Sequence, residues 1–133
     1  MYNEGTIIAL SSPPGSGAIS IIRLSGKDSI SAADKFFNSK SGKKLKDCNG
    51  YSISYGDFLV GKEVLDEVVI SLYKGPHSYT GEDVVEISCH GSNYIQQEII
   101  TSFTNAGVRL ASPGEFTLRA VSYTHLTLPT KRI

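Results

Sequence analysis

Two runs of β-forming residues with a very short connection between them constrain the fold of this chain most. Tyr51–Val60 and Val64–Tyr73 are rich in aromatic and branched side chains, and only Gly61, Lys62 and Glu63 separate them. A connection of that length joins neighbouring strands only in the antiparallel sense. The sequence therefore predicts a long β-hairpin in the middle of the chain, which Gly75 and Pro76 terminate.

Shorter segments on both sides of the hairpin alternate between strand and helix patterns. Four apolar runs predict further strands: Thr6–Leu10, Ala18–Leu24, Asp83–Cys89 and Val108–Ala111. Three segments favour helices: one that starts at Asp28 with Ile30, Ala33 and Phe37 on one stripe, one capped by Ser92 or Asn93, and one that starts at Pro113. Interleaved helices and a clear hairpin predict an α+β fold, in which a mixed β-sheet has flanking helices.

Composition places the chain among ordinary globular domains. It has 133 residues, 40% of them hydrophobic, and thirteen Lys and Arg balance thirteen Asp and Glu. A chain that is basic throughout, as many nucleic-acid-binding proteins are, is excluded. No apolar run reaches the roughly 18 residues of a membrane span, so no membrane association is expected. Two cysteines form no disulfide framework, and together with a start that lacks a signal-peptide pattern they predict a cytoplasmic protein.

One local concentration of positive charge stands out against this balance. Lys40, Lys43, Lys44 and Lys46 lie in a segment that also contains several Ser, Gly and Asn residues. This composition favours a mobile, solvated loop, and the alternative is a patch that binds RNA.

Two charged residues interrupt strands that are otherwise apolar. Arg23 follows Ile19, Ser20, Ile21 and Ile22, and Glu86 lies in the Asp83–Cys89 run. By the two-residue period of a strand, Glu86 shares a face with Ser88 and His90, an arrangement typical of the floor of a polar pocket. The residue pattern leaves two alternatives open, because Arg23 and Glu86 could also pair with each other or lie on a solvated face.

Recognisable nucleotide and metal motifs are missing from the sequence. The loops that contain Gly15 and Gly17, Gly75 and Gly81, or Gly114 do not match the phosphate-binding pattern G-x-x-x-x-G-K-[ST]. Cys89, His90 and His77 lack the repeated ligand spacing of a structural zinc site, so no metal ligand is assigned.

Five motifs, in order along the chain, carry a resemblance to a known family. They are Thr6-Ile7-Ile8-Ala9 with Pro13-Pro14-Gly15, Ile22-Arg23-Leu24-Ser25-Gly26, the block from Pro76 to Glu86, Cys89-His90-Gly91, and Pro113-Gly114-Glu115-Phe116-Thr117 with Arg119-Ala120. Through them, residues 1–120 resemble the N-terminal domain of the tRNA modification GTPase family MnmE, also called TrmE.

The resemblance implies a fold similar to tetrahydrofolate-binding domains and a module that forms a homodimer. It implies that a cofactor of the 5-formyltetrahydrofolate type binds near the dimer interface, with Arg23 and Glu86 as the cofactor-binding residues and no catalytic residue in this chain. Intact members of the family add a helical domain and a GTPase domain that takes GTP, Mg and K. With a flavoprotein partner, MnmG (GidA), they modify the wobble uridine of certain tRNAs.

Residues 121–133 depart from the family pattern. The family continues through a Phe-Leu-Asn-Gly-Lys-like stretch whose Lys also contacts folate, whereas this chain has a Pro129-containing tail without a helical stripe. We therefore expect a folate-binding and dimerisation domain over residues 1–120 and an artefactual or disordered tail over 121–133, with Lys131 not a folate ligand. Two other functions stay open: an interaction module that dimerises without binding folate, and a freestanding folate-dependent one-carbon transferase. Self-association is expected through sheet edges and loops of residues 1–120.

Overall fold

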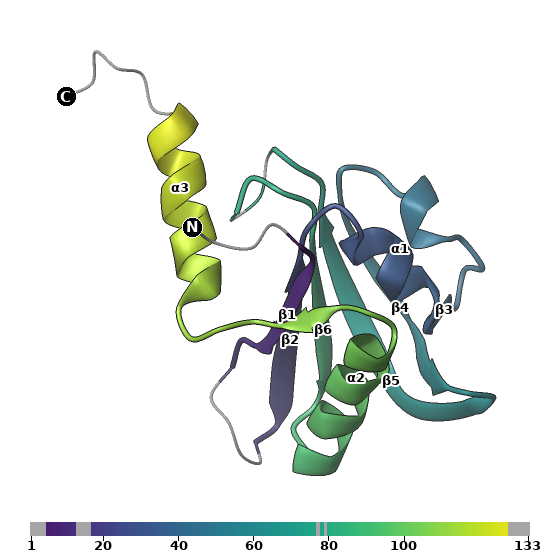
Figure 1. Ribbon diagram of the computed structural model, residues 1–133. Helices are drawn as coiled ribbons and strands as arrows, with labels where there is room; N and C mark the ends of the chain where they lie inside the picture. The colour runs from purple at the N-terminus through teal and green to yellow at the C-terminus, as the bar shows by residue number, and fades with distance from the viewer. Residues whose placement is uncertain (1–4, 13–16, 77, 79, 128–133) are drawn as a thin grey trace.

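A computed structural model describes residues 5–12, 17–76, 78 and 80–127 of the protein (Figure 1). Its elements are β1 (Ile7–Leu10), β2 (Ile19–Ser25), α1 (Ser29–Asp34), β3 (Phe37–Ser39), the 3₁₀ turn η1 (Leu45–Asp47), β4 (Tyr51–Val60), β5 (Glu63–Tyr73), β6 (Val84–His90), α2 (Asn93–Asn105), β7 (Arg109–Leu110) and α3 (Glu115–Thr127).

The predicted hairpin is confirmed as β4 and β5. Its strands pair antiparallel from Tyr51 opposite Tyr73 to Val60 opposite Glu63, with an irregularity in register between Phe58 and Leu59. Gly61 has a φ of 64°, a left-handed conformation that favours glycine, so the tight turn needs no strained side chain.

The described strands form one seven-stranded sheet in the order β3-β4-β5-β6-β2-β1-β7. Neighbouring strands are antiparallel except β1 and β7, which are parallel. The sheet is therefore mixed, and the predicted α+β class with flanking helices is confirmed. β3 and β7, at the two edges, have three and two residues. Edges this short offer little backbone for pairing with another chain.

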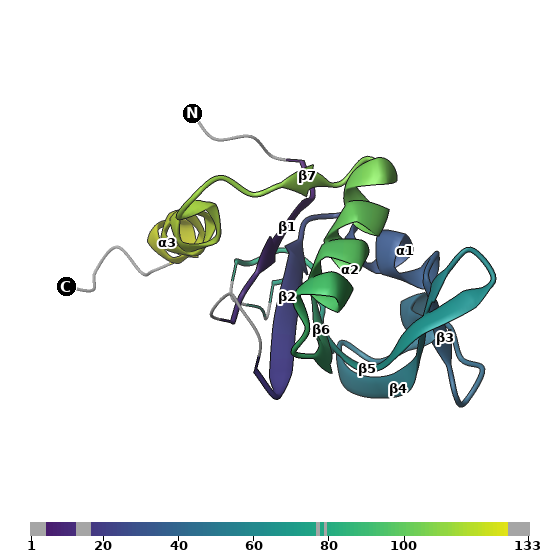
Figure 2. The ribbon, with the colours of Figure 1, turned by 90° about the horizontal axis from the view of Figure 1, so that it is seen from below.

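The hydrophobic core lies between one face of the sheet and helices α1 and α2, which cover that face together (Figure 2). Alternate strand residues such as Ile22 and Ile87 are fully buried there. In α2, Ser92 caps the first turn, and Ile99 and Phe103 face the sheet with no exposed surface. Helix α3 takes no part in this layer and leads away past β1 (Figures 1 and 2).

Two boundaries differ from those the sequence predicted. Helix α1 ends at Asp34, so Phe37, expected on its apolar stripe, instead starts β3 opposite Phe58. Apolar spacing alone does not separate these outcomes, because Phe37 is buried in either one. Helix α3 continues through Thr127, although no regular structure was expected after Ala120. Residues 128–133, which include Pro129 and Lys131, lie outside the described residues, and the domain boundary at residue 120 stays a prediction.

Replacement of Gly56 by alanine should destabilise the sheet. A Cβ atom at Gly56 would lie 2.2 Å from the Asn38 carbonyl oxygen on β3, so the two backbones would have to separate. Overpacking of this kind costs about 1–3 kcal/mol, which chemical denaturation followed by circular dichroism would measure. Gly50→Ala is the matched control, because its Cβ would meet only the Lys74 Cβ atom at 4.0 Å. Equal stability of the two variants would contradict the close approach.

Candidate functional site

The two charged residues that interrupt the apolar strands lie directly opposite each other. Strands β2 and β6 pair antiparallel, and Arg23 is the register partner of Glu86. Ile22 and Leu24, on either side of Arg23, point into the core, so Arg23 lies on the other face of the sheet. Glu86 is on that same face, between the buried Val85 and Ile87.

The two side chains form an ion pair with one carboxylate oxygen. The Arg23 Nε atom donates to Glu86 Oε2 at 2.7 Å, and Arg23 Nη2 lies 2.6 Å from the same oxygen. Within the described part of the chain, Glu86 Oε1 accepts no hydrogen bond. About a quarter of each side chain stays exposed, 26% for Arg23 and 21% for Glu86. Of the alternatives the sequence left open, mutual pairing is therefore present, and the pair remains accessible from solvent.

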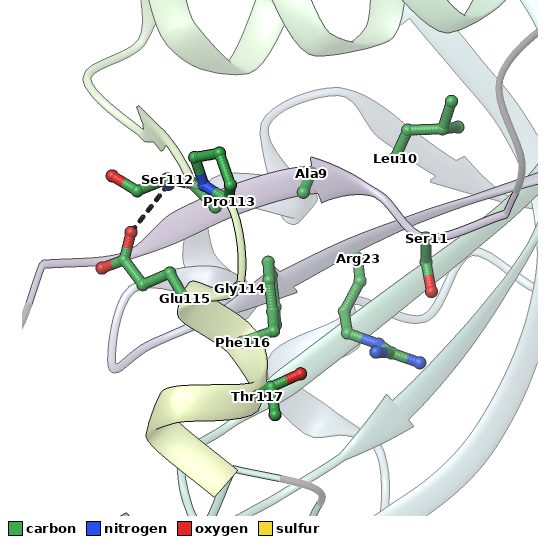
Figure 3. Close-up of a pocket in the computed structure, with 11 residues that line it drawn as sticks. Ala9, Leu10, Ser11, Arg23, Ser112, Pro113, Gly114, Glu115, Phe116 and Thr117 are labelled. Atoms are coloured by element: carbon green, nitrogen blue, oxygen red, sulfur yellow. Dashed lines mark hydrogen bonds between the residues drawn. The ribbon is translucent and has the colours of Figure 1, made fainter.

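Arg23 also lines a cleft between β1, β2 and the start of α3. The cleft has a volume of about 370 Å³, and its walls include Ser11, Ser112 and Phe116. The Arg23 guanidinium lies 5.8 Å from the centre of the Phe116 ring, within the range of a cation–π contact. In Figure 3 the Phe116 ring lies beside the Arg23 side chain, whereas the Glu115 carboxylate points to the Ser112 amide. One wall is thus flat and apolar, and the adjoining one is cationic.

The Phe116 wall is held by an ion pair at the first turn of α3. Glu115 receives hydrogen bonds from Arg109 Nη1 at 3.0 Å and Nη2 at 2.5 Å, a bidentate arrangement, and from the Ser112 amide at 2.9 Å. The hydrogen bonds from Arg109 lower the pKa of the Glu115 carboxyl, and they outweigh the opposing effect of burial. Only 6% of the Glu115 side chain is exposed, so this contact is buried. It holds the first turn of α3 in place and thereby positions the neighbouring Phe116.

Arg119, one turn further along α3, connects three distant parts of the chain. Its side chain is 1% exposed and donates to Glu82 Oε1 at 2.9 Å and to the Gly5 carbonyl at 2.6 Å. Glu82 Oε1 also accepts the Ser25 hydroxyl at 2.9 Å, and Ser25 lies 2.6 Å from the Thr80 hydroxyl. The Thr80–Glu82 loop is therefore attached both to β2 and to α3.

Sequence reasoning assigned no role to Arg109, Glu115, Arg119 or Glu82. They occur in a loop, in the two-residue strand β7 and in the first turns of α3, where charged residues are ordinary, and no periodicity marks them as buried. The only signal in the sequence is that Glu82, Glu115 and Arg119 fall inside the motifs that carry the family resemblance.

Ser88 and His90 share the sheet face of Glu86, as the strand period predicted, but they do not line the cleft beside Arg23. They border a second, smaller hollow of about 170 Å³. The His90 ring Nδ1 lies 2.7 Å from Asp66 Oδ1, and the His90 amide donates to Asp66 Oδ2 at 2.8 Å. Ser88 and His90 thus border this hollow and Glu86 lies beside the cleft, and a polar pocket with all three side chains on its floor stays a prediction.

No metal centre is found in the described ranges, where no group of three or more His, Cys, Asp or Glu side chains is placed to hold an ion. Cys89 is 3% exposed, and burial raises the pKa of its thiol to about 11, so it remains a neutral core residue. In the same ranges, no helix is both long and apolar enough to cross a membrane. The cleft itself offers a guanidinium and an aromatic wall, and the Glu86 carboxylate lies beside it in the pair with Arg23.

Glu115→Gln should destabilise the protein at neutral pH by about 1.5–3 kcal/mol, because it removes the charge that Arg109 and Arg119 face. The folded-state pKa of Glu115 is below its ordinary value of 4.5, so this stabilisation is complete above that value and is lost as the pH falls through the folded pKa. Denaturant unfolding at pH 7 and pH 3 should show the gap between wild type and variant shrinking in acid. Exposed Glu63→Gln is the control, and a gap independent of pH would refute the assignment.

Comparison with known proteins identifies the family. Residues 6–124 match the model of a domain family described as the GTP-binding protein TrmE N-terminus. The match includes the Arg23–Glu86 pair, the cleft and the first turns of α3. The chain therefore belongs to the TrmE N-terminal domain family.

Curated relatives agree with this assignment. The chain is 48% identical over 120 residues to a tRNA modification GTPase MnmE of Flavobacterium johnsoniae, covering 90% of this chain and 26% of that protein. It is 48% identical over 118 residues to the protein of that name from Parabacteroides distasonis, covering 86% and 25%. The Clostridioides difficile protein is 42% identical over 120 residues, covering 90% and 26%. The chain thus spans about a quarter of the length of these relatives.

Proposed function

We propose that this chain is the N-terminal module of a tRNA modification GTPase that acts on the wobble uridine, and that the module binds a 5-formyltetrahydrofolate-type cofactor and forms a homodimer in the cytoplasm. The observation that carries the binding proposal is the accessible Arg23–Glu86 pair beside a cleft of about 370 Å³. Cofactor sites of this size, with a few polar groups next to apolar walls, are usual in proteins.

Glu86 has the chemistry to hold the pterin ring of a folate. A carboxylate accepts paired hydrogen bonds from an amino group and a neighbouring ring N–H, which is the pattern that a pterin edge presents. Arg23 occupies Oε2, while Oε1 accepts nothing in the described part of the chain, so Glu86 retains acceptor capacity. Arg23 supplies donors for a carbonyl or carboxylate oxygen of the same ligand.

Phe116 and the cleft complete the fit to a flat, partly anionic molecule. An aromatic wall 5.8 Å from a guanidinium suits a ring that stacks on one side and accepts hydrogen bonds at its edge. The folate would supply a one-carbon unit, and the residues of this chain bind and orient it. Among the described residues that line the cleft, no acid–base set accompanies the pair, which favours a binding module over the freestanding transferase.

Glu86→Gln should weaken binding of 5-formyltetrahydrofolate about ten- to a hundredfold, measured by isothermal titration calorimetry, because one charge-assisted hydrogen bond is worth about 1.5–3 kcal/mol. The same change should cost at most about 1 kcal/mol of stability, since both partners are partly exposed.

Glu67→Gln provides the matched control for this titration. Glu67 is also a strand carboxylate in an ion pair, 3.6 Å from Lys40, but it lies away from the cleft. Its variant should bind folate like the wild type. Equal affinities of the wild type and Glu86→Gln, or no folate binding by the wild type, would refute the folate proposal and leave the dimerisation module standing.

The dimer proposal has separate support from the sheet face that α1 and α2 leave uncovered. β4 presents three large side chains on this face, with Tyr51 65%, Ile53 63% and Tyr55 49% exposed. By strand register, Ile53, Ser71, Glu86 and Arg23 form one row across the sheet. A second copy on this face would therefore lie next to the ion pair, whereas the edge strands are too short to offer much pairing.

Ile53→Asp should convert the protein from dimer to monomer in sedimentation equilibrium at micromolar concentration, because a charge in an apolar interface is not compensated. Leu110→Asp is the control, as Leu110 is 57% exposed but lies on the edge strand β7. Dissociation by Leu110→Asp alone would place the interface at the sheet edge, as the sequence predicted. A wild type that is monomeric would refute the dimer.

Activity of the whole protein rests on its relatives. They carry the name tRNA modification GTPase, and about three quarters of their length lies outside the matched part. In this proposal, GTP hydrolysis with Mg and K belongs to that remaining length, as does the work with tRNA and an MnmG-like flavoprotein partner.

A further inference from the structure

Four exposed lysines surround α1 and η1, at the end of the molecule away from α3 (Figure 1). They are Lys35, Lys43, Lys44 and Lys46, called the lysine patch below. The sequence favoured a mobile, solvated loop here, but the backbone that carries these residues is anchored. Leu45 is fully buried in the core between two of them. The Asp34 carboxylate accepts the amides of Leu45 at 2.8 Å and Lys46 at 3.1 Å.

Further contacts brace the segment from both ends. The Lys74 ammonium donates to the Cys48 carbonyl at 2.9 Å and ties the end of η1 to the end of β5. On the other side, Ser39 and Ser41 join their hydroxyls at 2.9 Å, and Ser41 accepts the Lys43 amide at 3.3 Å. The lysines therefore project from fixed positions, and less conformational entropy is lost when a ligand orders them.

The positive charge of the lysine patch is not neutralised within the described structure. Ion pairs there engage Arg23, Lys40, Arg109, Arg119 and His90, and none engages a lysine of the patch. Lys35, Lys44 and Lys46 line a hollow of about 380 Å³ together with Ser31 and Asp34. The lining of this hollow thus includes three lysines and one acidic residue, whose two carboxylate oxygens already accept backbone amides. A concave surface with this excess of charge attracts anions.

We propose that the lysine patch binds the phosphate backbone of a structured RNA. The hollow is lined by Ser, Asp and Lys residues without an aromatic side chain, so it offers no stacking surface for bases and favours contact with phosphates. Lysine ammonium groups act as rotatable point charges, which suits phosphates spaced along a strand. This inference rests on the proposed role in tRNA modification and names which surface of the module meets the RNA.

Fluorescence anisotropy of the full chain with two labelled RNAs, a tRNA transcript and an unrelated hairpin of similar length, tests this inference. Lys44→Gln/Lys46→Gln removes two charges from the patch, and Lys27→Gln/Lys62→Gln removes two exposed charges elsewhere. We expect the wild type to bind both RNAs with similar affinity, and the patch variant to bind about tenfold more weakly. The slope of log affinity against log salt should fall by about one to two units in the patch variant alone.

Three results would overturn the inference. The two double variants could bind RNA equally, the wild type could bind heparin or an acidic peptide but no RNA, or binding could be restricted to one RNA sequence. Folate calorimetry on the patch variant separates this inference from the proposed cofactor site. Normal folate binding with equal RNA affinities of the two variants defeats the inference alone. Loss of RNA binding in the patch variant only, without folate binding by any form, supports it and defeats the cofactor proposal.

Discussion

The antiparallel pairing of β2 with β6 fixes both faces of the sheet at once. Its register, from Ile19 opposite His90 to Ser25 opposite Val84, puts Ile22 and Ile87 side by side in the core and Arg23 beside Glu86 on the other face. A slip of one residue would bury the ion pair and expose the aliphatic side chains. Burial of the aliphatic side chains of β2 and β6 therefore fixes the register that brings Arg23 and Glu86 together. The position of Arg23 in the cleft thus depends on the packing of the core.

The parts of the fold that the sequence predicted are those with a strong local pattern. The hairpin follows from two β-rich runs and a short connection, and Arg23 and Glu86 stand out because each interrupts an apolar strand. Pairing of these two residues was one of several alternatives, since strand order is a long-range property. The contacts of Arg119 had no local signal, because Glu82 and Gly5 lie 37 and 114 residues away from it. The burial of Leu45 also had no signal in the sequence, because it is a single apolar residue among lysines.

The arginines and the lysines of this neutral chain differ in the contacts that they make. The guanidinium groups of Arg109 and Arg119 are used to dock α3, and Arg23 is shared between an ion pair and the cleft. The ammonium groups of the lysine patch take part in none of the ion pairs of the described residues and remain at the surface. Helices α1 and α2 cover one face of the sheet, and the aromatic side chains of β4 occupy the other. The sheet thereby separates a basic surface from the face that carries Glu86.

The contact between Arg119 and the Gly5 carbonyl has a consequence for how the chain folds as it is synthesised. β1 can pair with β2 early, but its other neighbour, β7, and the guanidinium that binds Gly5 come from residues 109–119. β1 thus leaves the ribosome well before the segments that complete its native contacts. Until β7 emerges, one side of β1 is an open strand edge, and release of the nascent chain before that point would leave the edge exposed to aggregation.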